Sequence, residues 1–247
     1  QNVTYRVGGL ANTGAEAFLE SFEPTFGAYL NETVGAMYPG VGFVAIPLSF
    51  DDVWTAVSSA SVDFLFLNPS TASCMEIEFG ANTLLSLRNL RQGVELNSYG
   101  GAVITSVNRT DITEIEHLKD KVVEGISVSG LGAFQLQWGM LEDLGLNLMV
   151  DISEIRLAYD QKKAREIVND VIDGSVDVGF VRSDMVSQMD AAADLVPEWP
   201  LQAMSHVSSD IVKEVARALM LIDRADEAAV SGFYSTWDAP LSFAGLR

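Results

Sequence analysis

Residues 126–134, ISVSGLGAF, contain the side chains best suited to hold a small anion. Two hydroxyl residues, Ser127 and Ser129, lie among small residues directly before apolar side chains with helical spacing. Backbone N–H groups at a helix start attract negative charge, and Gly130 and Gly132 let a ligand approach the main chain. An anion cradle and an ordinary serine-capped helix both fit this segment. A P-loop does not fit, since no Gly-Lys-Ser/Thr follows, and no dinucleotide fingerprint is present.

A motif that occurs twice places further polar side chains at the ends of predicted strands. SVDFLFLNPS begins at Ser61 and SVDVGFVRSD begins at Ser175. In each copy a short apolar run leads into polar residues, which is the pattern of a buried parallel strand ending in a loop. Ligands of open α/β sheets bind beyond the carboxyl ends of such strands. The candidate binding residues at these two ends are Asn68, Ser70, Arg182 and Ser183.

Each of these side chains also has a structural interpretation. Asn68 and Ser70 could simply cap the helix that follows. Arg182 could bind an oxyanion with its guanidinium group, or pair with Asp184 or with a partner across a hinge. The rim of the same site is also predicted to include Gly9 and Leu10, which follow the first predicted strand.

Two stretches of the chain repeat one order of predicted elements, strand–helix–strand–helix–strand. The first has strands at residues 3–8, 42–48 and 64–67, and helices at 15–34 and about 51–60. Pro24 should kink or split the first of these helices, and Asp51 or Asp52 should cap the second. The second stretch has strands at residues 121–126, 152–158 and 178–181, and helices at 131–144 and 160–172.

This order predicts an α/β fold of two Rossmann-like lobes joined by a two-strand hinge. Right-handed crossovers should make each lobe a small parallel sheet with helices on both faces. Lobe 1 is predicted to span residues 1–98 plus 204–247 and lobe 2 residues 99–203, with a ligand cleft between the lobes. Tyr99, at the first crossing, is a further candidate binding residue. Two crossings form a hinge that permits closure around a ligand.

The composition favours a soluble protein with an acidic surface. Of 247 residues 48% are hydrophobic, yet no run approaches the ~18–20 apolar residues that a membrane span needs. The net charge of −19 disfavours nucleic acid and anionic membranes as partners. Three sites match the N-glycosylation pattern, at Asn2, Asn31 and Asn108. An extracytoplasmic location, periplasmic or extracellular, is therefore expected.

The sequence offers no catalytic constellation. His117 and His206 are the two histidines, and neither has a nucleophile at a recognisable spacing. The single cysteine, Cys74, excludes an intrachain disulfide and a Cys-x-x-Cys metal site, and a buried inert thiol is its simplest interpretation. We expect no cofactor, no metal and no enzymatic activity.

Over nearly its whole length the chain resembles the phosphonate-binding periplasmic protein family, which has a type 2 periplasmic binding fold. The segments YRVGGL, VDFLFLNPS, SYGGAVIT, ISVSGLGAF and GSVDVGFVRSDM occur in the family's order. The ending, VPEWPLQAMSHV followed by a helix and YSTWDAPLSF, resembles the form of this domain found as the sensor region of membrane histidine kinases.

The resemblance implies a Venus-flytrap domain that closes on a small oxyanion such as a phosphonate or phosphate. The family often has an aromatic residue where Phe50 stands and a histidine where Tyr159 stands, and an aromatic residue after the Asn-Pro step is absent here. The family's hydroxyl-rich loop corresponds to Ser127, Ser129 and Gly130. Its strand-end positions correspond to Asn68, Pro69 and Ser70.

The expected function is therefore that of a sensory domain tethered to a membrane protein, which binds a small anionic ligand and acts on a membrane-anchored signalling module. The alternative is a solute-binding protein that delivers phosphonate-like compounds to the permease of an ABC importer. A second alternative is a small-molecule enzyme on the same fold, for which Cys74 is the available nucleophile. The oligomeric state is left open by the sequence.

Overall fold

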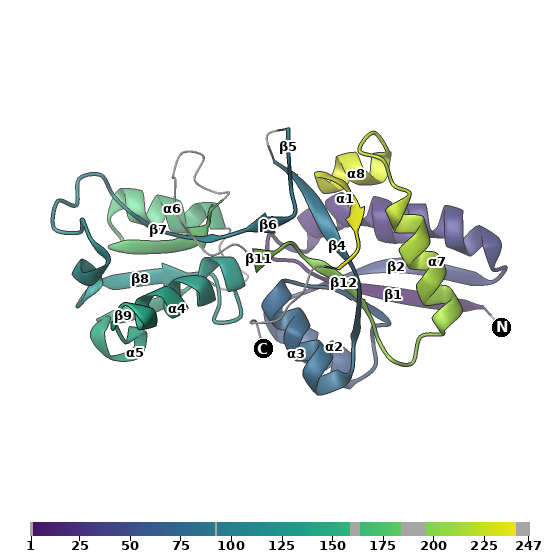
Figure 1. Ribbon diagram of the computed structural model, residues 1–247, viewed down its shortest axis with the longest axis horizontal. Coiled ribbons are helices and arrows are strands. Elements are labelled where there is room, and N and C mark those ends of the chain that lie inside the picture. Colours follow the sequence, from purple (N-terminus) through teal and green to yellow (C-terminus); the bar gives the residue numbers. More distant parts are fainter. Residues whose placement is uncertain (1, 92, 159–163, 184–195, 241–247) are drawn as a thin grey trace. The chain divides into compact units, whose positions relative to one another are not determined.

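The computed structural model describes residues 2–91, 93–158, 164–183 and 196–240. The chain forms two compact units (Figure 1), unit 1 from Gln1–Ser98 and Pro197–Arg247 and unit 2 from Tyr99–Val196. The two passages of the chain, β6 (Ser98–Tyr99) and β11 (Val196–Pro197), form a two-stranded sheet. The return to unit 1 comes earlier than the predicted boundary at residue 204, because β12 (Pro200–Ala203) pairs with strands of the unit 1 sheet.

The sheet of unit 1 is mixed, not purely parallel as predicted. Its order is β13-β4-β12-β3-β1-β2, with β5 paired to β4. β1 is parallel to β2 and β3, whereas β12, β4 and β13 join antiparallel. β4, β5 and β13 are not among the strands predicted from the sequence. The strands of this sheet introduced here are β1 (Val3–Leu10), β2 (Val41–Leu48), β3 (Phe64–Phe66), β4 (Asn82–Arg91), β5 (Val94–Leu96) and β13 (Tyr234–Asp238).

The first helical segment of unit 1 continues past Pro24. α1 (Ala15–Glu23) passes into two π-helical stretches, η1 (Pro24–Tyr29) and η2 (Asn31–Gly35). Pro24 occupies the first position of η1, and the winding of the helix changes there without the helix ending.

The helices α2 (Phe50–Ser58), α3 (Pro69–Phe79) and α7 (Ser209–Met220) of unit 1 each begin at a residue whose side chain caps the helix. Ser49, not Asp51 or Asp52, is the N-cap of α2: its Oγ accepts from the Asp52 N–H at 3.1 Å, and the Asp52 carboxylate accepts from the Ser49 N–H at 3.3 Å. This reciprocal pair is a capping box. A further helix of this unit is α8 (Glu227–Gly232).

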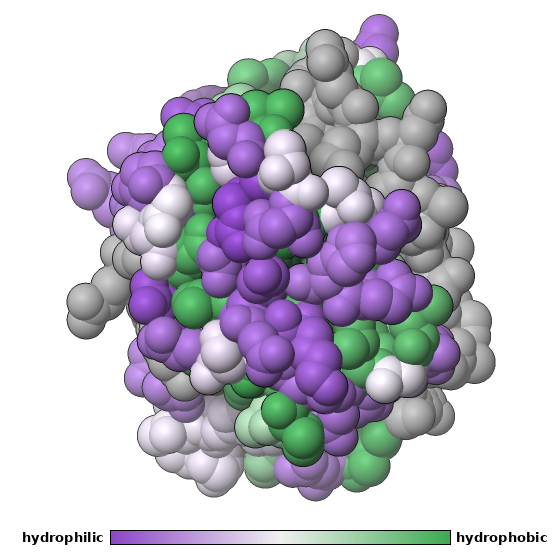
Figure 2. Space-filling view, turned by 90° about the vertical axis from the view of Figure 1, so that its left-hand side faces the viewer, coloured by the Kyte–Doolittle hydropathy of each residue, from purple (hydrophilic) through white to green (hydrophobic). Residues whose placement is uncertain are grey.

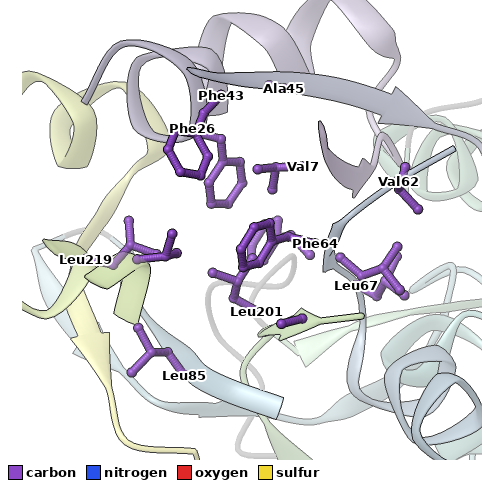
Figure 3. Packing of buried hydrophobic residues seen from close by; sticks show 14 of the residues in the cluster. Val7, Phe26, Phe43, Ala45, Val62, Phe64, Leu67, Leu85, Leu201 and Leu219 are labelled. Atoms are coloured by element: carbon purple, nitrogen blue, oxygen red, sulfur yellow. The ribbon is translucent and has the colours of Figure 1, made fainter. Parts of the chain in front are cut away.

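Aromatic side chains fill the core of unit 1. Phe43 of β2 and Phe64 of β3 have ring centroids 6.4 Å apart, and Leu201 of β12 lies in the same cluster (Figure 3). Phe26 of η1 packs edge-on against Phe66 at 5.5 Å. Burying such large apolar side chains stabilises each by roughly 1.5–3 kcal/mol, so this core fixes the strands whose ends carry the candidate residues.

Unit 2 is a smaller sheet of order β7-β10-β8-β9, in which β7 is antiparallel to β10 and the other pairs are parallel. Leu141 and Leu148 pack with Phe180 in one buried cluster, and Ile167 packs with Val181 in another, so helices cover both faces as predicted (Figure 1). The strands are β7 (Gly101–Thr105), β8 (Val122–Gly125), β9 (Glu154–Leu157) and β10 (Val178–Arg182). The helices are η3 (Ile115–Leu118), η4 (Leu131–Ala133), α4 (Gln135–Asp143), α5 (Leu148–Asp151) and α6 (Ala164–Asp173).

The helix predicted at residues 131–144 is divided into the short 3-10 turn η4 and the helix α4. Asp160, the predicted cap of the last helix in this unit, lies outside the described residues.

The repeated Ser-Val-Asp motif has the same structural role in both units. Asp63 donates its N–H to the Arg6 carbonyl at 2.9 Å, and its carboxylate accepts the Arg6 N–H at 2.7 Å. Asp177 donates its N–H to the Val122 carbonyl at 3.1 Å and accepts the Val122 N–H at 2.8 Å. An arginine side chain also contacts each carboxylate, Arg6 in unit 1 and Arg109 in unit 2. Each aspartate thus ties the start of its strand to the parallel neighbour, at the sheet edge opposite the predicted binding residues.

Candidate functional site

In unit 1 the carboxyl ends of the parallel strands meet at one edge of the sheet. Gly9 is paired with Phe66, and Leu10 with Leu48, so β1, β2 and β3 finish within about one residue of one another. The predicted residues Gly9, Leu10, Phe50, Asn68 and Ser70 all lie in or directly after these strand ends.

Asn68 caps α3. Its Oδ1 accepts the Thr71 N–H at 3.0 Å, its side chain is buried with 3% exposure, and Pro69 occupies the first helical position. The capping interpretation of Asn68 is therefore correct, and a ligand contact would be an additional role. Ser70 follows in the first turn and is half-buried. Backbone N–H groups of this first turn carry the positive end of the helix dipole.

Two of the predicted rim residues of unit 1 have buried side chains. Leu10 is 2% exposed and Phe50 is 8% exposed, and both belong to the hydrophobic core cluster. Gly9 is packed against the Phe18 ring, which leaves no space for a side chain there. Their role toward a ligand stays a prediction.

The hydroxyl-rich loop of unit 2 is held by hydrogen bonds within itself. The Ser127 Oγ accepts the Ser129 N–H at 3.2 Å, and the Ser127 carbonyl accepts the Gly130 N–H at 2.9 Å. The Gly130 carbonyl accepts the N–H groups of Ala133 and Gln135 at 3.3 and 3.1 Å. Ser127 is buried and Ser129 half-buried. The loop therefore has a defined shape before any ligand binds.

The serine-capped helix that the sequence also allowed is not formed. α4 begins after Phe134, which supplies no side-chain cap, and η4 has no side-chain cap either. Ser127 and Ser129 precede both turns and cap neither of them. This outcome leaves the anion-cradle interpretation of the two serines standing.

Arg182, Tyr99 and Gly132 are in contact at the same edge of unit 2. The guanidinium carbon of Arg182 lies 3.9 Å from the centroid of the Tyr99 ring, a cation–π contact. A Cβ added to Gly132 would lie 2.6 Å from Tyr99 Cε2 and 2.9 Å from Arg182 Cγ, closer than real Cβ contacts. Glycine is therefore required here, and its absent side chain makes the contact between loop and arginine possible.

Ser183 joins the end of β10 to the segment that precedes β7. Its N–H donates to the Gly100 carbonyl at 2.8 Å, and its Oγ accepts the Gly100 N–H at 3.0 Å. The structure thus brings Tyr99, Ser183 and Arg182 together. Tyr159 and Asp184 lie outside the described residues, so the predicted contacts of both stay predictions.

Arg109 and Lys121 of unit 2 form ion pairs with acidic side chains. Figure 2 shows hydrophilic residues across the middle of one face of unit 2. At the loop after β7, Arg109 pairs with Asp111 and Asp177, and Lys121 contacts Asp111 at 3.0 Å. Hydrogen bonds from Arg109 and then Lys121 hold the pKa of Asp111 well below its usual range. The charges of Arg109 and Lys121 are thus engaged within the cluster itself.

The structure assigns structural contacts to the remaining reactive side chains. His206 Nε2 lies 2.9 Å from the Asp63 carboxylate, and His117 Nδ1 accepts backbone N–H groups. Burial, and then Glu78, raises the pKa of the Cys74 thiol, so the thiol is neutral at physiological pH. Among the described residues, no group of three or more His, Cys, Asp or Glu side chains is placed to hold a metal ion.

Two buried glutamines were not recognised from the sequence. Gln137 of α4 and Gln202 of β12 are both fully buried and donate hydrogen bonds to neighbouring segments. The available signal for Gln137 was its spacing, because it lies three residues after Phe134 and four before Leu141, both of which are buried. A polar residue on the buried stripe of a helix requires partners, and it therefore marks a specific contact.

The comparison with known families agrees with this geometry. The model of the family described as "ABC transporter, phosphonate, periplasmic substrate-binding protein" matches residues 10–237. The chain belongs to this family. It is also 24% identical, over 97% of its length, to the tetrathionate sensor histidine kinase TtrS of Salmonella typhimurium. The chain spans 42% of that relative's length.

Solved structures with the same fold include a binding protein component of an ABC phosphonate transporter (PA3383) from Pseudomonas aeruginosa. It has a TM-score of 0.76 and 11% identity, covering 97% of this chain and 82% of that one. XAC2383 from Xanthomonas citri bound to ATP has a TM-score of 0.75 and 13% identity, covering 98% and 92%. PhnD1 from Prochlorococcus marinus in complex with methylphosphonate has a TM-score of 0.67 and 11% identity, covering 97% and 93%. The predicted type 2 periplasmic binding fold is confirmed.

Members of this family are binding and sensor proteins, and the domain is of the periplasmic type. In the described part of the chain, every helix is too short or too polar to span a bilayer.

Proposed function

We propose that this chain is the extracytoplasmic sensory domain of a membrane receptor and that it binds a small oxyanion. The observation that carries the proposal is the match of 97% of the chain to part of a sensor histidine kinase. The chain covers less than half of that relative, which supports a domain that acts through other parts of a larger receptor. Phosphonates, phosphate and sulfur oxyanions such as tetrathionate form the ligand class.

The chemistry of unit 2 supports an anionic ligand. Arg182 offers a permanent positive charge and a planar set of donors, and its stacking on Tyr99 limits the orientations of the guanidinium. Ser129 is half-buried in a loop of defined shape, and a serine hydroxyl is a group that can donate a hydrogen bond to an oxyanion. Ser127 shapes that loop through its own Oγ. The three side chains together suit terminal oxygens of a tetrahedral anion.

The proposal includes the expectation that residues from unit 1, above all Ser70 in the first turn of α3, complete the site. A ligand signals by binding one conformation of its receptor more tightly than another. A site built from both units would link ligand binding to closure of the hinge at β6 and β11, and closure would be the signal passed to the membrane-anchored module.

The experiment is a titration of the purified chain with methylphosphonate, inorganic phosphate and tetrathionate. Calorimetry measures the affinity for each anion, and thermal unfolding measures the stability that each anion adds. A ligand at about 100 times its dissociation constant should stabilise the fold by about 2.7 kcal/mol. Arg182→Ala and Ser129→Ala should weaken binding, whereas Arg217→Ala, which removes an equal charge from an exposed position on α7, should not. Unchanged affinity in Arg182→Ala and Ser129→Ala would show that the site is elsewhere.

The second candidate is a solute-binding protein of an ABC importer, which is favoured by the family's description as a substrate-binding protein of ABC transporters. The same ligand-binding chemistry would serve it. The two functions are distinguished by assays of the whole gene product: a receptor should change kinase activity when the oxyanion is added, whereas an importer component should support uptake of the oxyanion.

A further inference from the structure

Gln137 places a buried amide at the centre of unit 2. Its side chain is 1% exposed and projects from the face of α4 that also carries the buried Phe134 and Leu141. The Nε2 group lies within hydrogen-bonding distance of three backbone carbonyls, those of Ala102, Gly132 and Val181, at 3.1, 3.0 and 2.9 Å.

The three carbonyls belong to the three backbone segments that meet at the candidate site. Gly132 ends the hydroxyl-rich loop, and it contacts Tyr99 and Arg182. Val181 directly precedes Arg182 in β10, and Ala102 pairs with Val181 across the strands. One amide group therefore joins the loop, the strand end that carries the arginine, and the strand that follows the tyrosine.

The backbone of β7 is adapted to this amide. A Cβ added to Gly101 would lie 2.7 Å from the Gln137 Nε2, too close for any side chain. Gly101 is paired with Arg182 in the β7–β10 ladder, so the space left by the glycine lies beside the arginine. The glycine and the glutamine thus form one arrangement.

The hydrogen bonding of the Gln137 side chain is only partly satisfied. Its two N–H bonds are shared among three carbonyls, and its Oε1 is buried without a hydrogen-bond partner in the described parts of the chain. A buried acceptor without a partner is unfavourable, and an apolar side chain of similar length would avoid that loss. The hydrogen bonds of Gln137 act instead on position, because they fix segments that are distant in the sequence.

We propose that Gln137 is a positioning residue for anion binding, which holds the loop at residues 127–132 in register with Arg182. The inference rests on the proposed function for its binding consequence. Its structural consequence, an ordered loop before ligand binds, holds without that function. A preorganised loop loses less entropy on binding and therefore binds more tightly.

The fold supplies a matched control in unit 1. Gln202 is likewise a fully buried glutamine, and its Nε2 donates to the Ala72 carbonyl at 3.0 Å and to Thr83 Oγ1 at 3.1 Å. Gln137→Met and Gln202→Met remove the same chemical group from the two units. Only the first should affect the loop at residues 127–132.

The first measurement is hydrogen exchange of the ligand-free full chain. Gln137→Met should speed exchange of the amides at residues 126–135 by about tenfold or more, while Gln202→Met leaves them at the wild-type rate. Equal exchange of these amides in wild type and Gln137→Met overturns the proposal, and so does an equal increase in both variants. This result does not depend on any ligand.

The second measurement is the affinity for whichever of methylphosphonate, phosphate or tetrathionate binds the wild type. Gln137→Met should weaken that binding about tenfold or more, beyond the effect of Leu148→Ala, a core variant that lowers the stability of the same unit from α5. Equal effects of the two variants would make Gln137 a structural residue only. If none of the three anions binds the wild type, the proposed function fails, and the exchange experiment alone decides the role of Gln137.

Discussion

Gly132→Ala should destabilise unit 2, and the magnitude can be worked out from the structure. The new Cβ would lie 2.6 Å from Tyr99 Cε2, 0.8 Å short of the 3.4 Å at which ordinary contact begins (3.4 − 2.6). Tyr99 is only 3% exposed and cannot move into solvent without cost. Overpacking of this kind costs about 1–3 kcal/mol, and losing the stacking of Arg182 on Tyr99 adds about 1 kcal/mol. We expect a total of about 2–4 kcal/mol.

Gly139→Ala is the control, because the same change should have the opposite sign. Gly139 lies in the middle of α4, is exposed, and has no atom within 4 Å of the position of an added Cβ. Replacing an exposed glycine inside a helix by alanine stabilises by about 0.5–1 kcal/mol. Urea unfolding of both variants, followed by circular dichroism, measures the two changes in the free energy of unfolding.

The signs of the two effects test the description of the site. A Gly132→Ala variant as stable as the wild type, with Gly139→Ala stabilised as expected, would mean that the loop does not contact Tyr99 and Arg182 closely. The same experiment with an oxyanion ligand present should show a weaker ligand stabilisation in Gly132→Ala, since the alanine displaces Arg182.

Three further predictions concern stability. Burial acts to raise the pKa of Asp177, but the hydrogen bond from Val122 and the contact with Arg109 outweigh it and leave the pKa below its usual value. The stability that the carboxylate contributes is therefore present above about pH 4 and is lost as pH falls through the lower folded-state pKa. Asp177→Asn should cost about 1–3 kcal/mol at pH 7 and should make the stability depend less on pH in acid. Burial raises the pKa of Tyr234 to about 12. The free energy of unfolding should therefore fall between about pH 10 and pH 12, where the tyrosine ionises in the unfolded chain first. Tyr234→Phe should reduce this fall in stability, measured by unfolding at a series of pH values and followed by tyrosinate absorbance. Asn68→Ala removes the cap of α3 and should cost about 1 kcal/mol in urea unfolding, whereas Asn68→Asp, which keeps the accepting oxygen, should recover most of it.

The sequence predicted the positions of the parallel strands of each unit well. Apolar runs such as Phe64–Phe66 are buried on both faces of the sheet, and this leaves an unbroken local pattern. The pairing of β4 with β13 was missed because the two strands are distant in the sequence: Arg88 of β4 contacts Asp238 of β13, 150 residues away. Pairing over such a separation depends on the whole fold and leaves no local spacing to recognise.

The candidate site was predictable in its residue types and not in its supports. Hydroxyls and glycines at residues 127–132 indicated an anion site, and the structure gives that loop a defined shape. The contacts of Tyr99 and Gln137 join separate segments of the chain, so the sequence could mark Tyr99 as a candidate and Gln137 as a polar residue on a buried stripe but could not give their partners. The Ser-Val-Asp repeat identified two strands correctly. Its aspartates hold neighbouring strands together, and the sequence pattern did not show this role.

The position of those two aspartates has an evolutionary consequence. Asp63 and Asp177 secure each sheet at the start of its strand, and the candidate ligand contacts lie at the other end of the same strands. Substitutions in the loops therefore leave these two ties between strands in place. A binding domain built on this plan can change the side chains that face a ligand while the anchoring of its strands persists.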